Sequence, residues 1–152
     1  MRKLFFIVMA LVLTACSVAG AAGNQSEIDQ NKEKWQTANI SHYRYNLSIT
    51  CFCVFSQDMP LIIEVQDGEV VSMEFQSGNE IDASSRELFD KYATIDRLFA
   101  ELEADINGAA DKVTVAAYDP TYGFPTEVTI DFVEEATDDE LYLSLSSFEA
   151  LP

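Results

Sequence analysis

Six segments of this chain alternate apolar and polar residues with a period of two, the pattern of β-strands that bury one face. The clearest of them carries apolar residues at every odd position from Tyr43 to Cys53. Repeated alternation of this kind requires a sheet whose apolar face is covered by other elements. The six segments lie at 43–53, 61–65, 71–75, 113–117, 128–132 and 141–145.

Two further segments have helical periodicity. Ile28 and Trp35 share one face of a helix predicted over residues 26–39. A second helix is predicted to follow Thr94 as its N-cap and to end at Gly108, where a left-handed residue is favoured. The order is therefore helix, three strands, helix, three strands. Because the connections are short, we expect an α+β fold with one or more antiparallel sheets and the helices packed on one sheet face.

The hairpin around residues 66–68 predicts a register. A two-residue turn would place Ile63 opposite Ser72 and mix apolar with polar side chains on one face. A three-residue loop with Gly68 in the left-handed conformation instead places Ile63 opposite Val71. We therefore expect the three-residue loop.

Composition limits the classes of protein that this chain can belong to. Its 152 residues match one domain, and a 48% hydrophobic content is enough to fill a core. Lys and Arg number 9 and Asp and Glu number 26, for a net charge of −17. Nucleic acid is therefore excluded as a partner, because its phosphates would face an anionic surface.

Residues 1–15 have the pattern of a secretory signal, with a basic start and an apolar run at 4–12. Residues 13–16, Leu-Thr-Ala-Cys, resemble the lipobox of bacterial lipoproteins, and this resemblance implies that Cys16 becomes the lipidated first residue. It also implies a location in the cell envelope. In a Gram-negative source, Ser17 after the cysteine implies sorting to the outer membrane.

Three parts of the chain are thus expected: a lipoprotein signal peptide at 1–15, a lipidated cysteine with a flexible tether at 16–26, and a single α+β domain at 27–152. Cleavage removes two basic residues and no acidic one, which takes the net charge from −17 to −19. Such a surface is repelled by anionic headgroups, so the attachment to the membrane is expected through the lipid alone. The charge favours a basic envelope protein as partner.

Several short motifs follow one another in a characteristic order and spacing. They are Trp35, Tyr43-x-Tyr45, Cys51-Phe52-Cys53, Asp67-Gly68, Thr94-Ile95-Asp96, and Tyr118-Asp119 with Gly123-Phe124-Pro125 before Ile130-Asp131. In this order they resemble domain-of-unknown-function family 6174, small bacterial envelope lipoproteins, over nearly all of the mature chain. The resemblance implies a location and an architecture, and it implies no activity.

Cys51 and Cys53 are expected on the same face of the first strand, with Cα atoms about 6.5 Å apart. That distance is at the upper edge for a disulfide, so a bridge needs a local bulge or twist. A structural disulfide is the favoured interpretation, because the exported chain meets an oxidising compartment. A redox-active pair, a soft-metal site and two unpaired thiols stay open as alternatives.

Motifs of the large enzyme classes are missing from the sequence. The sole histidine, His42, has no nucleophile elbow or glycine-rich oxyanion loop with it, and there is no His-Glu-x-x-His, phosphate-binding or dinucleotide motif. We therefore expect no catalytic residue and no cofactor. The acidic stretch is a candidate calcium site, with Asp138, Asp139 and Glu140 as ligands, although their spacing is not that of an EF-hand.

The segment 119–125 is first of all a turn, and its aromatic residues are also candidates for exposed contacts with a partner. The candidate residues are Asp119, Tyr122, Gly123, Phe124 and Pro125. Taken together, the sequence predicts a membrane-anchored envelope lipoprotein that acts as a non-enzymatic binding or structural module. The alternatives are a thiol-disulfide oxidoreductase that uses Cys51 and Cys53, and a carrier with an apolar groove between helices and sheet.

Overall fold

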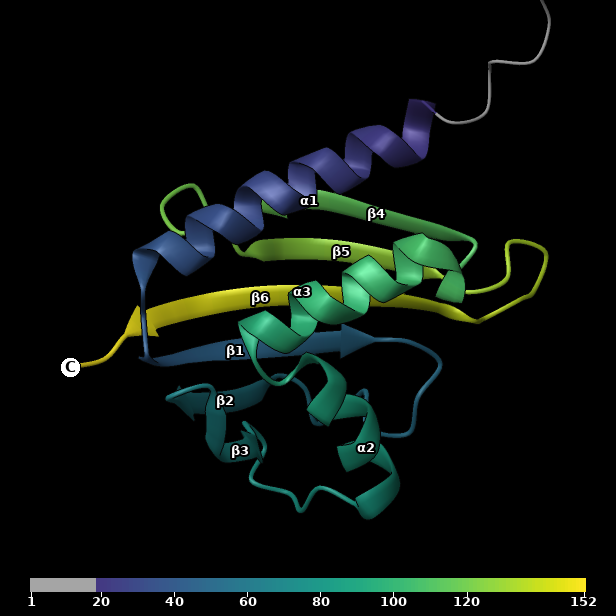
Figure 1. Cartoon of the computed structure of the whole chain (residues 1–152). Helices are drawn as coiled ribbons and strands as arrows, with labels where there is room; N and C mark the ends of the chain where they lie inside the picture. Colours follow the sequence, from purple (N-terminus) through teal and green to yellow (C-terminus); the bar gives the residue numbers. More distant parts are fainter. Residues whose placement is uncertain (1–18) are drawn as a thin grey trace, which may run out of the picture.

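The computed structural model describes residues 19–152, and it describes side chains from Gln25 onward. The signal peptide predicted at 1–15 and the lipidation predicted at Cys16 therefore lie outside the described residues. Three α-helices cover one face of a single antiparallel sheet (Figure 1). The elements in chain order are α1 (Ala19–Ala38), β1 (His42–Thr50), β2 (Leu61–Gln66), β3 (Glu69–Phe75), α2 (Ala83–Tyr92), α3 (Ile95–Ala104), the π-helix η1 (Asp105–Ala109), β4 (Lys112–Tyr118), β5 (Pro125–Asp131) and β6 (Glu140–Ala150).

The strand order is β3-β2-β1-β6-β5-β4, so two three-stranded meanders meet at the centre of the sheet. The first and last strands form that junction, with Leu47 opposite Leu145. The predicted α+β class, the antiparallel pairing of sequential strands and the helices on one face are confirmed. Because β1 and β6 pair along almost their whole length, there is one sheet rather than two.

The hairpin between β2 and β3 differs from the predicted one. A two-residue turn joins the strands, and both of its residues have positive φ, 52° at Asp67 and 81° at Gly68. The register then shifts by one residue at a β-bulge, so that Ile63 pairs with Met73. The predicted pairing of Ile63 with Val71 is wrong, because Val71 is the extra bulge residue. The bulge restores the apolar row that a regular two-residue hairpin would have broken.

Helix α1 begins at Ala19, so residues 19–26 are helical where a flexible tether is predicted from sequence. Three of the first four residues of the helix are alanine, the residue with the highest helix propensity. Within the helix the Gln25 side-chain amide donates to Asp29 Oδ1 at 2.9 Å. None of the helices within residues 19–152 combines the length and the apolar character that a membrane crossing requires.

Two α-helices and the π-helix η1 stand between β3 and β4, where one helix was predicted to follow Thr94. The carboxylate of Asp82 caps the additional helix, α2, by accepting hydrogen bonds from the backbone N–H groups of Ser84 and Ser85. Thr94 caps α3 through its hydroxyl, as predicted. Gly108 has a φ of 118°, which confirms the left-handed residue expected at the end of this helical segment.

The core lies between the helices and the sheet, and two tyrosines of β1 tie these layers together. The Tyr43 hydroxyl accepts a hydrogen bond from the Ile95 N–H at 3.1 Å, and the Tyr45 hydroxyl donates to the Tyr92 carbonyl at 3.0 Å. Burial raises the pKa of both phenols well above the ordinary value. Both hydroxyls are satisfied and neutral, so they serve the core rather than a reaction.

Candidate functional site

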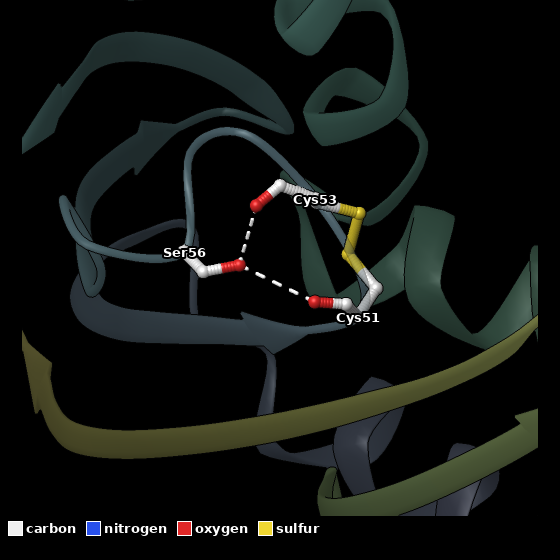
Figure 2. Close-up of a disulfide and its surroundings, with 3 residues drawn as sticks. All are labelled: Cys51, Cys53 and Ser56. Carbon is white, nitrogen blue, oxygen red and sulfur yellow. Dashed lines mark hydrogen bonds between the residues drawn. A yellow bond between two sulfur atoms is a disulfide. The ribbon is translucent and has the colours of Figure 1, made fainter. Parts of the chain in front are cut away.

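Cys51 and Cys53 form a disulfide, as the sequence predicts (Figure 2). The predicted position within a strand is wrong, since β1 ends at Thr50 and both cysteines lie in the connection to β2. Leaving the strand brings the two Cα atoms to 5.2 Å, against the longer spacing of an extended segment. The departure from strand geometry thus supplies the local bend that the bridge needs.

Two neighbours hold the disulfide loop in place. The Ser56 hydroxyl lies 2.7 Å from the Cys53 carbonyl oxygen and 3.3 Å from that of Cys51, and it donates to both (Figure 2). The ring of Phe55 is buried and meets the ring of Phe89 edge-on at a centroid distance of 4.7 Å. One side of the loop is therefore anchored in the core beside α2.

The loop turns its other apolar side chains outward. Phe52 is 90% exposed and Val54 is 92% exposed. Cys51, before Phe52, and Cys53, between the two exposed residues, are half-buried. Water would normally drive such side chains into a core, because burying each is worth about 1.5–3 kcal/mol. The disulfide and Phe55 fix the alternation of inward and outward residues, so Phe52 and Val54 have no room to turn in. This pair of exposed side chains is the candidate binding feature.

Phe52 and Val54 were not among the binding residues predicted from the sequence, although the chain carries a signal for their exposure. Along β1 the even positions, such as Asn46 and Ser48, face away from the core and are polar. Phe52 and Val54 continue the even positions with apolar residues. Apolar residues at positions that continue a solvent-facing row indicate an interaction surface, which a partner covers.

An acidic segment lies at the same end of the sheet as the disulfide loop (Figure 1). Thr50, the last residue of β1, pairs with Tyr142 near the start of β6, and Glu140 pairs with Asp131 at the end of β5. The β5–β6 connection and the disulfide loop therefore leave neighbouring strands on the same side. This connection carries the acidic residues Glu134, Glu135, Asp138 and Asp139.

Asp131 lies near several of these carboxylates, and its pKa shows their effect. Its pKa is raised, first by desolvation and then by neighbouring negative charges. The charged neighbours are Asp139, Glu140, Glu134 and Asp111. The strand pairing sets one cation beside this group, since Lys112 lies opposite Asp131. The end of the sheet is thus a site of accumulated negative charge.

The residues predicted as calcium candidates, Asp138, Asp139 and Glu140, lie in the connection between β5 and β6 and at the start of β6. Asp139 Oδ2 accepts a hydrogen bond from the Val133 N–H at 2.7 Å, so this carboxylate shapes the turn. Within the described part of the chain, no three His, Cys, Asp or Glu side chains come together closely enough to hold a metal ion.

The segment 119–125, predicted as an exposed partner loop, turns its aromatic rings inward. Phe124 is 2% exposed, and its ring contacts those of Trp35 and Phe148 at centroid distances of 6.0 Å and 4.7 Å. Tyr122 is half-buried against Phe148. The prediction of exposed aromatic contacts is therefore wrong for Phe124, because this loop closes the core under α1.

Gly123 and Asp119 explain why this loop fits so closely. Gly123 has a φ of 83°, and a Cβ at this position would lie 2.7 Å from the Asn31 carbonyl oxygen of α1. The Asp119 carboxylate accepts hydrogen bonds from the N–H groups of Thr121 and Tyr122. Pro125 is buried at the start of β5. The loop is therefore an internal packing element.

His42 belongs to a structural contact at the opposite end of β1. Its Nε2 lies 2.9 Å from Glu64 Oε1, and its Nδ1 lies 3.1 Å from the Pro152 carbonyl oxygen. The hydrogen bond with Glu64 is the largest cause of a raised His42 pKa. The imidazole thus fastens the C-terminal residue to the β1–β2 pair, far along the sheet from the disulfide loop.

Two cavities among the described residues differ in size and in openness to solvent. The space between α1, η1 and β4, beside Ile28 and Val113, has a volume of about 10 Å³, close to that of one water molecule. A larger hollow of about 430 Å³ beside Met73 and Ile81 is an open surface depression. The first of these spaces lies between helices and sheet, where a carrier would hold its ligand, and it is too small for a small organic molecule.

Residues 27–150 match a known protein family, from the middle of α1 to the last residue of β6. The chain belongs to the family of unknown function DUF6174. No curated protein and no solved structure matches the chain. Membership in DUF6174 agrees with the resemblance seen in the motifs, and it covers the disulfide loop, the acidic connection and the complete sheet.

Proposed function

We propose that this DUF6174 chain is an envelope lipoprotein, anchored through Cys16, whose domain acts as a non-enzymatic binding module. The observation that carries the binding function is the pair of exposed apolar side chains on the disulfide loop, Phe52 and Val54. Hydrocarbon side chains can bind a partner, and they cannot act as acid, base or nucleophile. A disulfide also suits an exported protein, because such bonds persist in oxidising compartments.

The anchoring part of the proposal rests on the sequence of residues 1–16. A basic start, an apolar run and a Leu-Thr-Ala-Cys box stand in the order that lipoprotein processing requires. The folded domain follows closely, because α1 begins at Ala19, three residues after Cys16. Acyl chains on Cys16 would hold an acidic domain at a membrane that its own surface charge repels.

Substitution of the anchor residue tests the location. The full chain and its Cys16→Ser variant are expressed with radiolabelled palmitate, and cell fractions are then separated. Wild type should carry label and sediment with membranes, whereas Cys16→Ser should lose the label and leave the membrane fraction. Cys51→Ser is the matched control, and it should keep both. Membrane association of unlabelled Cys16→Ser would contradict the anchor.

A thiol-disulfide oxidoreductase is the second candidate, because the disulfide between Cys51 and Cys53 is half-buried rather than sealed in the core. Titration with a redox buffer, followed by alkylation and mass spectrometry, separates the two functions. A structural bridge should stay oxidised at potentials near those of thiol-exchange catalysts. Reduction at those potentials would place the oxidoreductase first.

A further inference from the structure

We infer that the disulfide end of the sheet is a docking surface for a Lys- and Arg-rich protein segment that also carries apolar residues. We call this the disulfide-end surface, and it consists of Phe52, Val54, Val133 and Tyr142 with the acidic connection 134–140. The inference rests on the proposed binding function and names the chemistry of the partner.

The distribution of exposed apolar residues is the first support. Five large apolar side chains of the described residues are about half exposed or more, and four of them lie on the disulfide-end surface. Val133 is 52% exposed and follows the end of β5, while Tyr142 is 49% exposed near the start of β6. The fifth, Val71, is 53% exposed at the bulge of β3. Scattered apolar residues need no explanation, but their concentration at one end indicates an interaction surface.

Strand pairing brings these residues to the same place. Phe52 follows Thr50 by two residues, and Thr50 is the pairing partner of Tyr142. Val133 follows Asp131 by two residues, and Asp131 pairs with Glu140. Three separate parts of the chain thus meet at the ends of β1, β5 and β6 (Figure 1).

The charge of this surface selects a basic partner. Glu134, Asp139 and Glu140 of the acidic connection lie close enough to Asp131 to raise its pKa, so negative charge accumulates at the end of the sheet that carries the apolar residues. Lys or Arg side chains at the rim would relieve this repulsion while apolar side chains cover Phe52 and Val54. An apolar centre with a complementary charged rim is the usual arrangement of a protein interface.

Charge also argues against the two other occupants. A second copy of this chain across a two-fold axis would set one acidic connection against another, because such an interface uses the same patch twice. An anionic membrane surface would repel the same carboxylates. A basic protein segment satisfies both the apolar and the acidic parts of the surface.

The disulfide prepares this surface for binding. The Cys51–Cys53 bridge, the Ser56 hydrogen bonds and buried Phe55 hold the loop in one shape. A loop that is ordered beforehand loses less conformational entropy when a partner binds. Phe52 is an aromatic side chain of the kind that is enriched at the centres of protein interfaces.

Peptide binding tests the inference with the full chain in phosphatidylcholine nanodiscs. The probes are a labelled peptide of mixed Lys and Leu and an all-Lys peptide of equal charge, and anisotropy is corrected for empty nanodiscs. We expect the Lys–Leu peptide to bind at least tenfold more tightly than the all-Lys peptide. The double variant Phe52→Ser with Val54→Ser should weaken Lys–Leu binding at least tenfold. Val71→Ser, which removes an exposed apolar residue on β3 outside this surface, should leave it unchanged.

Several outcomes would overturn the inference. Equal binding of the two peptides would mean that charge alone attracts them, and an equal loss in Val71→Ser would mean that the contact is unspecific. Blue-shifted emission from Phe52→Trp in the nanodisc before peptide is added would assign the surface to the membrane. A dimer that the double variant dissociates would assign it to a second copy.

Peptide binding and lipid anchoring are read out independently. Loss of palmitate label with intact peptide binding would refute the anchor and keep the docking surface. Normal anchoring with no difference between wild type and the double variant would refute the docking surface and keep the anchor.

Discussion

Two loops of this protein carry neighbouring aromatic and apolar residues, and they use them in opposite ways. The β4–β5 loop puts Phe124 into the core against Trp35, and the close approach of Gly123 to α1 leaves no gap. The β1–β2 loop sends Phe52 and Val54 into solvent and buries only Phe55. Aromatic content alone therefore does not distinguish a binding loop from a packing loop.

The difference lies in what restrains each loop. Noncovalent packing against α1 holds the β4–β5 loop, and such packing is gained only by turning apolar residues inward. A covalent bond holds the β1–β2 loop, so its shape does not depend on burying Phe52 or Val54. A short disulfide loop can thus keep apolar residues exposed for a partner at little cost to the folded state.

The largest effect that we expect is a difference in stability between two variants, Phe124→Ala and Phe52→Ala, each of which truncates one phenylalanine of one loop. Phe124→Ala should lower the free energy of unfolding by roughly 3–5 kcal/mol, because it removes a buried ring. Phe52→Ala should change it by less than about 0.5 kcal/mol, because the ring is already in solvent. Urea denaturation followed by circular dichroism measures both. Similar losses in the two variants would contradict the contrast between the loops.

Removal of the bridge should have an intermediate effect. The double variant Cys51→Ala with Cys53→Ala should lose roughly 1–2 kcal/mol of stability, since the bridge closes a very short loop and restricts the unfolded chain little. Hydrogen exchange should increase over residues 51–56 and stay unchanged at the β4–β5 loop. Reduced wild type is the control and should behave like the variant. Global loss of protection would show that the bridge supports the core instead.

The smallest effect concerns charge at the disulfide end. Asp131→Asn should raise the melting temperature at neutral pH, because it removes one of several crowded carboxylates. A carboxyl whose pKa is raised by folding favours the folded state in its protonated form, so this group destabilises the protein as pH rises through that pKa. The advantage of Asp131→Asn should therefore vanish in acid. Glu33→Gln, which removes one negative charge at an exposed position of α1, is the matched control.

Sequence reasoning performed best where the pattern is local. Alternation located all six strands, and the Thr94 cap and Gly108 marked the segment of α3 and η1. It performed worst where a distant contact or a small irregularity decides the outcome. The β3 bulge at Val71 changes the register of a whole hairpin by one residue, and no local preference announces it.

Of the candidate site, only the cysteine pairing could be predicted from the sequence. The pairing of Cys51 with Cys53 followed from their spacing and from the export signal predicted at 1–15, whereas the bend after Thr50 that permits it did not. Phe124 looked like a surface residue because proline, glycine and aspartate surround it, and only its contact with Trp35 shows otherwise. Turn residues indicate the local backbone geometry, and they do not indicate which distant segment packs against the turn.

By itself the sequence determined the α+β class, the antiparallel pairing of sequential strands, the acidic charge and the cysteine pair, because these depend on periodicity, composition and close spacing. The tertiary structure alone decided which loop is covered and which is open. Helix α1 lies over the β4–β5 loop, and nothing in the described chain lies over Phe52 and Val54. Burial of a loop residue is a property of segments that are distant in sequence, and their meeting is decided by the whole fold.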